Sequence, residues 1–494
     1  MCLQSSITSV PPDFGAMALK RESGPPLMRL RHARARLATT HMRFLRHAAA
    51  LCLLAAGLVG CGGTITYGGS TFPSKQQPSA VAYTPIEPPL TPPPGTTDGN
   101  LLAFDAKTGN SLWHSEAPMA DMGQPVVAGG LVFVHGGYGG PHNILAAFDS
   151  VNGHPTWRMG MPAICGEDSV GPAIFLVIGC IGAAAGPPSM LMLVSARDPK
   201  TGRELWTATG VAAAAGSGTV LLIVPAPSGD FKVRGLDALT GHQLWEANLT
   251  VTNIPPLVNG QVALVQRYGC LTSASPPDIN PSSCSGPGQA SSFVSRLDPA
   301  TGNQLWQTGF GKGSQVRRLL LGDVAVFSVD VELPPPPGQL PPAVPPPGAI
   351  GALDPATGME LWRQTVSTEL SIPAVAAPGT VYVEQTKPSS ALNQCPTNRL
   401  DALDSKSGTP RWLIDNLPAC EMFVDADGHT VVLVLTSFSG TKIVVLDSVT
   451  GTELWEKPMP SSGLYPLVHA SVSGGVVYVS ESGHFGAPSP PAGD

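Results

Sequence analysis

The feature that most constrains this chain is a phrase that recurs eight times and contains every tryptophan of the sequence. In each copy an Asp stands eight residues before the Trp, and a Gly follows that Asp by four residues. Successive Asp residues lie 39 to 61 positions apart, and such a spacing with loop-sized variation is typical of a repeat architecture. The eight pairs are Asp105 and Trp113, Asp149 and Trp157, Asp198 and Trp206, Asp237 and Trp245, Asp298 and Trp306, Asp354 and Trp362, Asp404 and Trp412, and Asp447 and Trp455.

The pattern within each phrase predicts a β-hairpin. An alternating apolar segment ends at the Asp, a turn follows, and a second short segment ends at the Trp. The Asp side chain can accept hydrogen bonds from turn N–H groups, and the Gly adopts the positive φ that closes the turn. Between the phrases we expect another strand pair, as in 124–134, 254–265, 372–383 and 466–479. One repeat should therefore be four short antiparallel strands, A and B followed by C and D.

The two ends of the repeat region each supply half of one four-strand repeat. The first phrase, near Leu101, follows a Pro-rich stretch at 73–98 and lacks strands A and B, whereas these strands remain after Trp455 and end near Ser480. We expect the two ends to complete one sheet. Because a small sheet cannot bury both faces alone, residues 100–482 are predicted to form an all-β, eight-bladed β-propeller of four-stranded antiparallel blades. The tryptophans should pack between blades rather than stack on a ligand.

The phrase resembles the tryptophan-docking motif A-x-D-x-x-T-G-x-x-x-W of the pyrroloquinoline-quinone-type (PQQ-like) propeller family. The motif Ala is present at Ala103, Ala147, Ala196, Ala352 and Ala402, and it is replaced by Gly235, Arg296 and Val445. Asn152 and Ser407 replace the motif Thr. The resemblance covers about residues 100 to 480 and implies the propeller fold. It is less specific for function, because quinoprotein dehydrogenases, kinase sensor domains and scaffold lipoproteins share this fold.

The N-terminal region is predicted to be a targeting signal. From Met42 a basic segment precedes a short apolar run at 48–59, which identifies 42–60 as a secretory signal peptide. The sequence ending at Cys61 resembles a bacterial lipobox, so Cys61 is the expected site of lipidation. A conventional signal cleaved nearby, or a buried cysteine, is the alternative.

Other segments outside the repeats have simpler interpretations. Residues 1–41 are interpreted as an upstream extension beyond the true start or as a long basic region of the signal. Residues 61–99 are predicted to be a lipidated, Pro-rich tether and 483–494 a disordered tail. Gly62 after the lipid site, rather than Asp, resembles sorting to the outer membrane of a bacterium with two membranes.

Charge excludes some partners. The whole chain carries 28 basic and 35 acidic residues, and without residues 1–60 the counts become 20 and 33, a formal charge of −13. Such an acidic body is not expected to bind nucleic acid or anionic lipid headgroups, so membrane attachment would depend on acyl chains. The 56 Gly and 52 Pro residues indicate many turns.

Six cysteines remain beyond the lipid site and form three local couples. We predict the disulfides Cys165–Cys180, Cys270–Cys284 and Cys395–Cys420, with free buried thiols as the alternative. No couple has the spacing of a zinc site, and no metal is predicted. His135 and His142, in a Gly-rich loop, are expected to be solvated rather than metal ligands.

An enzymatic function is not favoured by the sequence. The resemblance to quinoprotein dehydrogenases would imply a disulfide between adjacent cysteines, Ca²⁺ ligands and an Asp base, but no two cysteines are adjacent. We therefore predict no catalytic residue and no cofactor. A PQQ-dependent dehydrogenase is kept as the lesser alternative.

The combination of lipid anchor, Pro-rich spacer and propeller resembles the BamB family of lipoproteins. That resemblance implies a non-catalytic scaffold, anchored in the outer membrane and facing the periplasm, that binds proteins of the β-barrel assembly machine. A cell-envelope or surface-displayed binding or adhesion propeller of unknown ligand is the alternative. We expect a monomeric propeller that binds through its loops. The B–C connections at 268–292, 331–348 and 385–398 are the long ones, and 331–348 would be either a polyproline II ligand or a solvated spacer.

Overall fold

Every regular element that the structure describes is a β-strand. A computed structural model describes residues 96–137, 142–162, 169–170, 175–180, 192–216, 218–226, 231–252, 255–271, 279–280, 284, 290–331, 348–366, 370–387, 395–459 and 468–483. All of them belong to one unit of the chain, Ala80–Asp494. No helix in this part of the chain is long and apolar enough to span a membrane. The predicted all-β class is confirmed.

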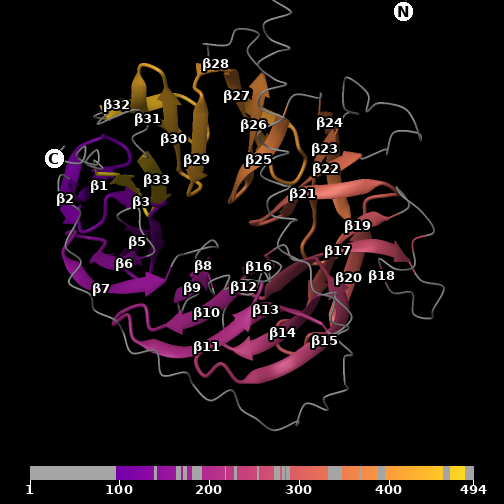
Figure 1. Cartoon of the computed structure of the whole chain (residues 1–494). Coiled ribbons are helices and arrows are strands. Elements are labelled where there is room, and N and C mark those ends of the chain that lie inside the picture. Colours follow the sequence, from indigo (N-terminus) through magenta and orange to yellow (C-terminus); the bar gives the residue numbers. More distant parts are fainter. Residues whose placement is uncertain are drawn as a thin grey trace, which may run out of the picture. The chain divides into compact units, whose positions relative to one another are not determined.

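The strands assemble into four-stranded antiparallel sheets in which strands adjacent in sequence are neighbours (Figure 1). Three of these sheets contain β3 (Asp121–Met122), β4 (Val126–Ala128), β5 (Leu131–Gly137), β6 (His142–Asp149) and β7 (Pro155–Pro162); β8 (Ser169–Val170), β9 (Phe175–Cys180), β10 (Met192–Arg197) and β11 (Glu204–Gly210); and β12 (Ala212–Ala215), β13 (Thr219–Pro225), β14 (Phe231–Asp237) and β15 (Gln243–Val251). In the first of them β3 and β4 both pair with β5, so that they share the place of strand A.

Four more sheets follow the same plan. They contain β16 (Leu257–Asn259), β17 (Val262–Leu271), β18 (Ile279–Asn280), β19 (Ser291–Leu297) and β20 (Gln304–Gly309); β21 (Ser314–Leu321), β22 (Ala325–Val331), β23 (Gly348–Leu353) and β24 (Glu360–Val366); β25 (Leu370–Ala377), β26 (Thr380–Lys387), β27 (Thr397–Asp404) and β28 (Pro410–Pro418); and β29 (Glu421–Ala426), β30 (Thr430–Ser437), β31 (Gly440–Asp447) and β32 (Glu453–Met459). Strand β18 is an addition that pairs with the far end of β17.

One further sheet, which we call the chain-end sheet, combines both ends of the repeat region. It contains β1 (Gly99–Asp105), β2 (Ser111–Ala117), β33 (Val468–Ser473) and β34 (Val476–Glu481). Strand β1 pairs antiparallel with β34, from Asn100 opposite Glu481 to Asp105 opposite Val476. In Figure 1 the yellow C-terminal strand β33 accordingly lies among the indigo N-terminal strands.

The apolar core lies between the sheets. The middle strands have apolar residues on both faces, and β30 shows an unbroken buried run from Thr430 to Leu435. Each sheet therefore packs on both sides, as in the cluster that joins Val477 of the chain-end sheet to Val432 and Ile443 of the sheet before it. Burial of both faces explains why middle strands such as β13 and β30 carry unbroken apolar runs.

The prediction that the second segment of each phrase ends at the Trp is wrong. In every repeat the Trp is the third residue of strand D, and the strand continues beyond it, as in β2 from Ser111 to Ala117. Strand D lies at the edge of its sheet, so its later residues alternate between buried and exposed positions. Because polar residues occupy the exposed positions after the Trp, the sequence pattern did not reveal that the strand continues there.

Deletion of the C-terminal strands tests the structural importance of the chain-end sheet. Removal of residues 466–494 should lower the unfolding midpoint by about 10 °C or more, because β1 loses one of its two neighbouring strands and several kcal/mol of apolar contact. Thermal unfolding followed by circular dichroism measures this midpoint. A chain that ends at residue 483 retains every strand and is the control. Equal midpoints for both truncations would contradict the prediction.

Candidate functional site

The repeated phrase forms a link from each sheet to the next. The indole N–H of each Trp donates a hydrogen bond to the backbone carbonyl of the residue that follows the Asp in the next phrase, at 2.8 to 3.1 Å. The acceptors, for Trp113 to Trp455 in order, are Ser150, Pro199, Ala238, Pro299, Pro355, Ser405, Ser448 and Ala106. The last Trp thus bonds to the first phrase.

The tryptophans are not all equally enclosed. Trp113, Trp245 and Trp362 are buried, whereas the other five are half-buried. Packing of the indoles between sheets therefore leaves five of the eight partly accessible to solvent. Strand D is the outer edge of its sheet, so one side of the indole faces the neighbouring turn while its rim reaches solvent.

The turn Gly has a steric role in addition to its backbone conformation. All eight turn glycines have φ between +68° and +74°. A Cβ at any of them would also lie closer than 3.0 Å to the indole of the preceding repeat, as for Gly408 against Trp362. Only glycine satisfies both requirements, and the sequence had indicated only the first.

The motif Ala lies between two larger side chains. Ala103 is opposite Trp113 on one neighbouring strand and Tyr478 on the other, and the two rings are 6.0 Å apart. Ala402 lies in the same way between Trp412 and Tyr382, with the rings 5.8 Å apart. A larger residue would separate these rings, which explains the preference for Ala at this position.

Arg296, which replaces the motif Ala in one repeat, adds a second link. Its Nη1 donates to the carbonyl of Pro355 at 3.0 Å, and the Trp306 indole donates to the same oxygen at 3.0 Å. The replacement therefore retains the contact between these two sheets and adds a charge-assisted hydrogen bond to it.

Strand D contains a β-bulge at the residue before each Trp. In all eight C–D pairs the register shifts just after the motif Ala position on strand C, so that the strand-D residue before the Trp has no partner on strand C. A bulge increases local twist and redirects the following side chain. Here it turns the Trp toward the next sheet and leaves large apolar side chains exposed at Leu112, Leu244, Leu305, Leu361 and Leu454.

The repeat Asp carboxylates are engaged in turn formation. Asp237 Oδ1 accepts from the backbone N–H groups of Leu239 and Thr240, at 3.1 and 2.8 Å, and from the Thr240 hydroxyl at 2.8 Å. The hydroxyl and backbone donors lower the pKa of Asp105, Asp237, Asp354 and Asp447. These carboxylates therefore shape the turns, and most of the turn donors converge on a single carboxylate oxygen.

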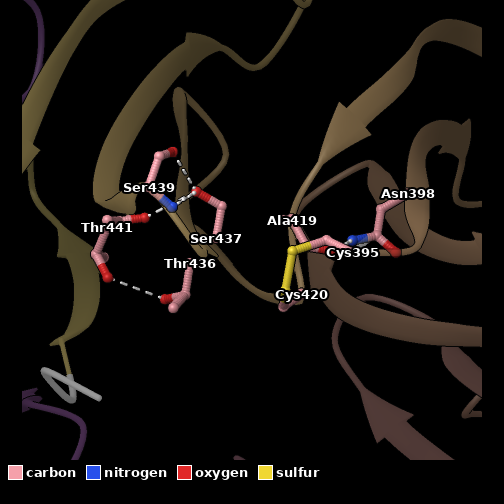
Figure 2. The surroundings of a disulfide bond; sticks show 9 residues. Cys395, Asn398, Ala419, Cys420, Thr436, Ser437, Ser439 and Thr441 are labelled. Atoms are coloured by element: carbon pink, nitrogen blue, oxygen red, sulfur yellow. Dashed lines mark hydrogen bonds between the residues drawn. A yellow bond between two sulfur atoms is a disulfide. The ribbon is translucent and has the colours of Figure 1, made fainter. Parts of the chain in front are cut away.

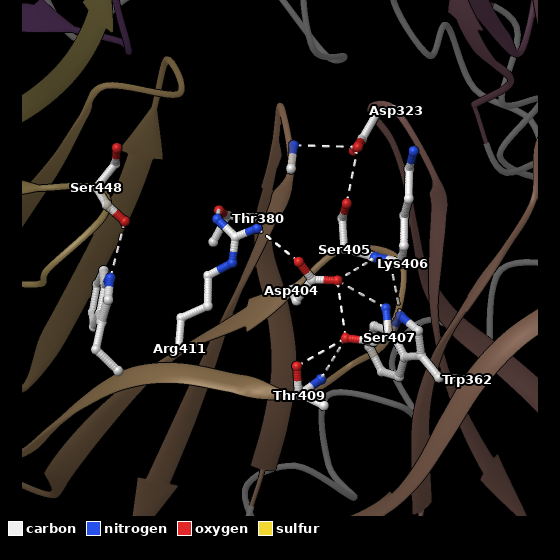
Figure 3. Close-up of polar contacts among 12 residues, drawn as sticks. Asp323, Trp362, Thr380, Asp404, Ser405, Lys406, Ser407, Thr409, Arg411 and Ser448 are labelled. Atoms are coloured by element: carbon white, nitrogen blue, oxygen red, sulfur yellow. Dashed lines mark hydrogen bonds and ion pairs between the residues drawn. The ribbon is translucent and has the colours of Figure 1, made fainter.

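Asp404 shows the strongest form of this arrangement (Figure 3). Its pKa is lowered well below the ordinary range, first by Arg411, whose Nη2 lies 2.7 Å from Oδ2, and then by the Ser407 backbone and hydroxyl. The neighbouring Ser405 donates its hydroxyl to Asp323 at 2.9 Å, and Asp323 also accepts from the Gly379 N–H. This turn is thus connected to the preceding sheet through both Trp362 and Asp323.

Two of the predicted disulfides are present, Cys270–Cys284 and Cys395–Cys420. The second joins the segment before β27 to the connection between β28 and β29 (Figure 2). Asn398 Nδ2 donates to the Ala419 carbonyl at 2.8 Å, and the Cys420 N–H donates to Thr436 at 2.7 Å. These bonds place the disulfide at a junction between two neighbouring sheets.

Several predicted features lie outside the described residues. They include Cys61, Cys165 with its predicted bond to Cys180, the signal peptide, most of the tether and most of the three long connections. Among the residues that are described, no group of three or more His, Cys, Asp or Glu side chains could hold a metal ion. His135 is half-buried on β5, whereas His142 begins β6.

Comparison with known protein families shows to which family the chain belongs. The family model described as "Outer membrane protein assembly factor BamB" matches residues 93–170, 192–276 and 290–486. The chain belongs to the BamB family. The match covers all eight docking phrases of this BamB-family chain. No curated protein sequence matches the chain.

Solved structures of several proteins are similar to this BamB-family chain. BamB from Moraxella catarrhalis is 13% identical, with 78% of this chain and 99% of that chain covered and a TM-score of 0.43. Quinohemoprotein alcohol dehydrogenase from Comamonas testosteroni is 12% identical, with 81% and 78% covered and a TM-score of 0.43. Apo AztD from Citrobacter koseri is 11% identical, with 78% and 99% covered and a TM-score of 0.46. The family assignment rests on the sequence match and not on these similarities.

A glycine substitution tests the steric role of the turn. Gly408→Ala should destabilise the fold by about 2 kcal/mol or more, because the new Cβ is strained at positive φ and overlaps the Trp362 ring. Gly474→Ala is the control, since Gly474 has φ +60° but open space around it. It should lose only the backbone term of about 1 kcal/mol. Urea unfolding measures both, and equal losses would contradict a role for the indole.

Because of the turn carboxylates, the free energy of unfolding should fall as the pH becomes acidic. Because the pKa of Asp447 is lower in the folded than in the unfolded chain, its contribution is present above about pH 4 and is lost as pH falls further. Asp447→Asn should weaken the fold at pH 7 and flatten the decline between pH 4 and pH 2. Glu453→Gln, an exposed change in β32, is the control. Urea midpoints measured across this range provide the test, and an unchanged slope in Asp447→Asn would contradict it.

Proposed function

We propose that the sheets form a closed, eight-bladed propeller. Two observations support this arrangement: β1 pairs with β34, and the Trp bonds run from each phrase to the next until Trp455 reaches Ala106. A closed ring leaves no sheet face without a neighbour, which suits sheets whose middle strands are apolar on both faces. The propeller would comprise residues 100–482 and act as a monomer.

The propeller would be held at a membrane by a lipid on Cys61. The support is the lipobox-like sequence that ends at Cys61 after a short apolar run. The Pro-rich segment 61–99 would then be a semi-rigid tether between lipid and propeller. With a formal charge of −13 after residue 60, the mature chain would depend on acyl chains rather than basic residues for membrane binding.

The function of the chain would be that of a non-catalytic scaffold. We infer that it assists assembly of outer-membrane β-barrel proteins from the periplasmic side, and the family match across all docking phrases is the observation that carries this proposal. It would bind proteins of the assembly machine through its loops. The repeat carboxylates, which would be the most numerous candidates for chemistry, are already committed to turns.

A binding or adhesion propeller is the second candidate. Two disulfides brace connections between strands B and C or between D and the next A. Such braces suit a surface that must keep its shape while it contacts a partner. This role would need no assembly machine and would place the propeller on the cell surface.

Crosslinking in the native host distinguishes these roles. Full-length protein with a C-terminal tag should be crosslinked in cells, purified from membranes and analysed by mass spectrometry. Recovery of β-barrel assembly proteins is expected. If the protein stays in membranes, is cleaved by protease added to whole cells and recovers no assembly protein, the scaffold proposal is wrong and the adhesion role is favoured.

Variants at two cysteines complete this experiment. Cys61→Ser should lose metabolic labelling with palmitate, because the lipid attachment site is lost. Cys52→Ser lies within the predicted signal peptide, leaves the lipobox intact and should be labelled like the unmodified chain. Palmitate labelling of Cys61→Ser would contradict the lipid anchor without affecting the scaffold proposal.

A further inference from the structure

The chain-end sheet is held to its neighbours by polar contacts on both sides of β33. On one side, Met122 N–H donates to Ser482 at 3.1 Å, and Ser480 donates to the Gly123 carbonyl at 2.8 Å. Ser471 also donates to the Pro125 carbonyl. We call residues 121–125 the latch segment. Because these bonds involve side chains, the seam lacks the regular hydrogen-bond ladder that holds strands within a sheet.

The other side of β33 meets β29. The Asp425 carboxylate accepts from the Val472 N–H at 2.9 Å. Two residues earlier, the Phe423 ring lies edge-on to the His469 imidazole, with ring centroids 5.2 Å apart. His469 is therefore placed on the short strand that contacts both neighbours, and it is half-buried.

The groups that face His469 come from three elements. Asp121 of β3, His135 of β5 and Glu421 of β29 all act on its charge, and Asp425 lies further along β29. His135 packs against the latch segment, because a Cβ on Gly123 would lie within 3.0 Å of its ring. Two imidazoles thus approach the same seam, one from β33 and one from β5.

We infer that the seam between the chain-end sheet and its neighbours is an acid-sensitive latch, opened locally by protonation of His469. At this half-buried position the neutral imidazole packs against the Phe423 ring, whereas the imidazolium would lose part of its hydration and its charge would be disfavoured by the nearby His135. The chain ends would then separate from the latch segment while the rest of the sheets stayed folded. This inference does not depend on the proposed function.

The sign of the effect follows from burial. Burial lowers the pKa of His469 below 6.5, and His135 lowers it further, while Asp121 and Glu421 partly oppose this. The unfolded or opened chain then binds the proton more readily, so the contribution of His469 is present above pH 6.5 and is lost as pH falls below it. Burial raises the pKa of Asp425 and of Glu481, and protonation of these carboxyls favours the closed state. These two carboxyls therefore oppose the effect of His469 as pH falls, and the opening should be clearest in the first pH unit below the ordinary value of histidine, between pH 6.5 and 5.5.

Hydrogen–deuterium exchange of the full mature chain tests the latch. Exchange of peptides from β33 and residues 121–125, corrected for the intrinsic effect of pH, should rise by up to about tenfold between pH 7.5 and pH 5.5. Peptides from β13 should show no such rise. His469→Gln should remove the pH effect, while His154→Gln, in an exposed turn, should retain it.

Two results would overturn the inference. One is exchange at the seam that does not change with pH. The other is an equal rise with pH in His469→Gln, provided that this variant matches the unmodified chain at pH 7.5. If His469→Gln exchanges faster at pH 7.5, His469→Phe replaces it, since Phe keeps the edge contact with Phe423 and cannot be protonated.

Discussion

The packing of each indole against the turn glycine of the next repeat is the contact on which this fold depends. It joins an indole and an acceptor that are 32 to 54 positions apart in seven repeats and 349 apart in the eighth, and it combines a hydrogen bond, apolar burial and a close backbone approach in a single place. The bulge before the Trp directs the ring, the motif Ala makes room for it, and the Asp shapes the turn that receives it. The recurring Ala, Asp, Gly and Trp of the phrase therefore all serve the same contact between neighbouring sheets.

The hairpins and the strand pairs between the phrases could be predicted because alternation and turn residues are local signals. The pairing of the chain ends followed from counting strands, since the first phrase lacks strands A and B and the last is followed by them. The position of Ala103 beside Tyr478 and the close approach of Gly408 to Trp362 could not be predicted, because each depends on a partner far away in the sequence. The sequence also predicts D strands that end too early, at the Trp. Only alternate residues of an edge strand such as β2 are buried, so the apolar signal beyond the Trp is weak.

The candidate site was less predictable than the fold. The repeated phrase identifies the family, but the same phrase serves the interior of the protein, and its carboxylates are occupied by turn donors. We propose that partners bind at the connections between strands, and the sequences of these connections follow no repeat that would reveal the residues involved. His469 also carried no signal, because the Phe423 ring and the charged groups near it belong to other strands that only the three-dimensional arrangement brings together.

The acceptor of every tryptophan bond is a main-chain oxygen, and this has a consequence for how such a protein can diversify. A carbonyl is supplied by any amino acid, so this bond places no demand on the side chain of the acceptor. The next residue along the turn likewise contributes only its N–H, which donates to the repeat Asp, and that residue is Lys107, Val151, Lys200 or Leu239 in the first four repeats. Cationic and apolar side chains can therefore stand at these turns without any change in the bonds that join the sheets.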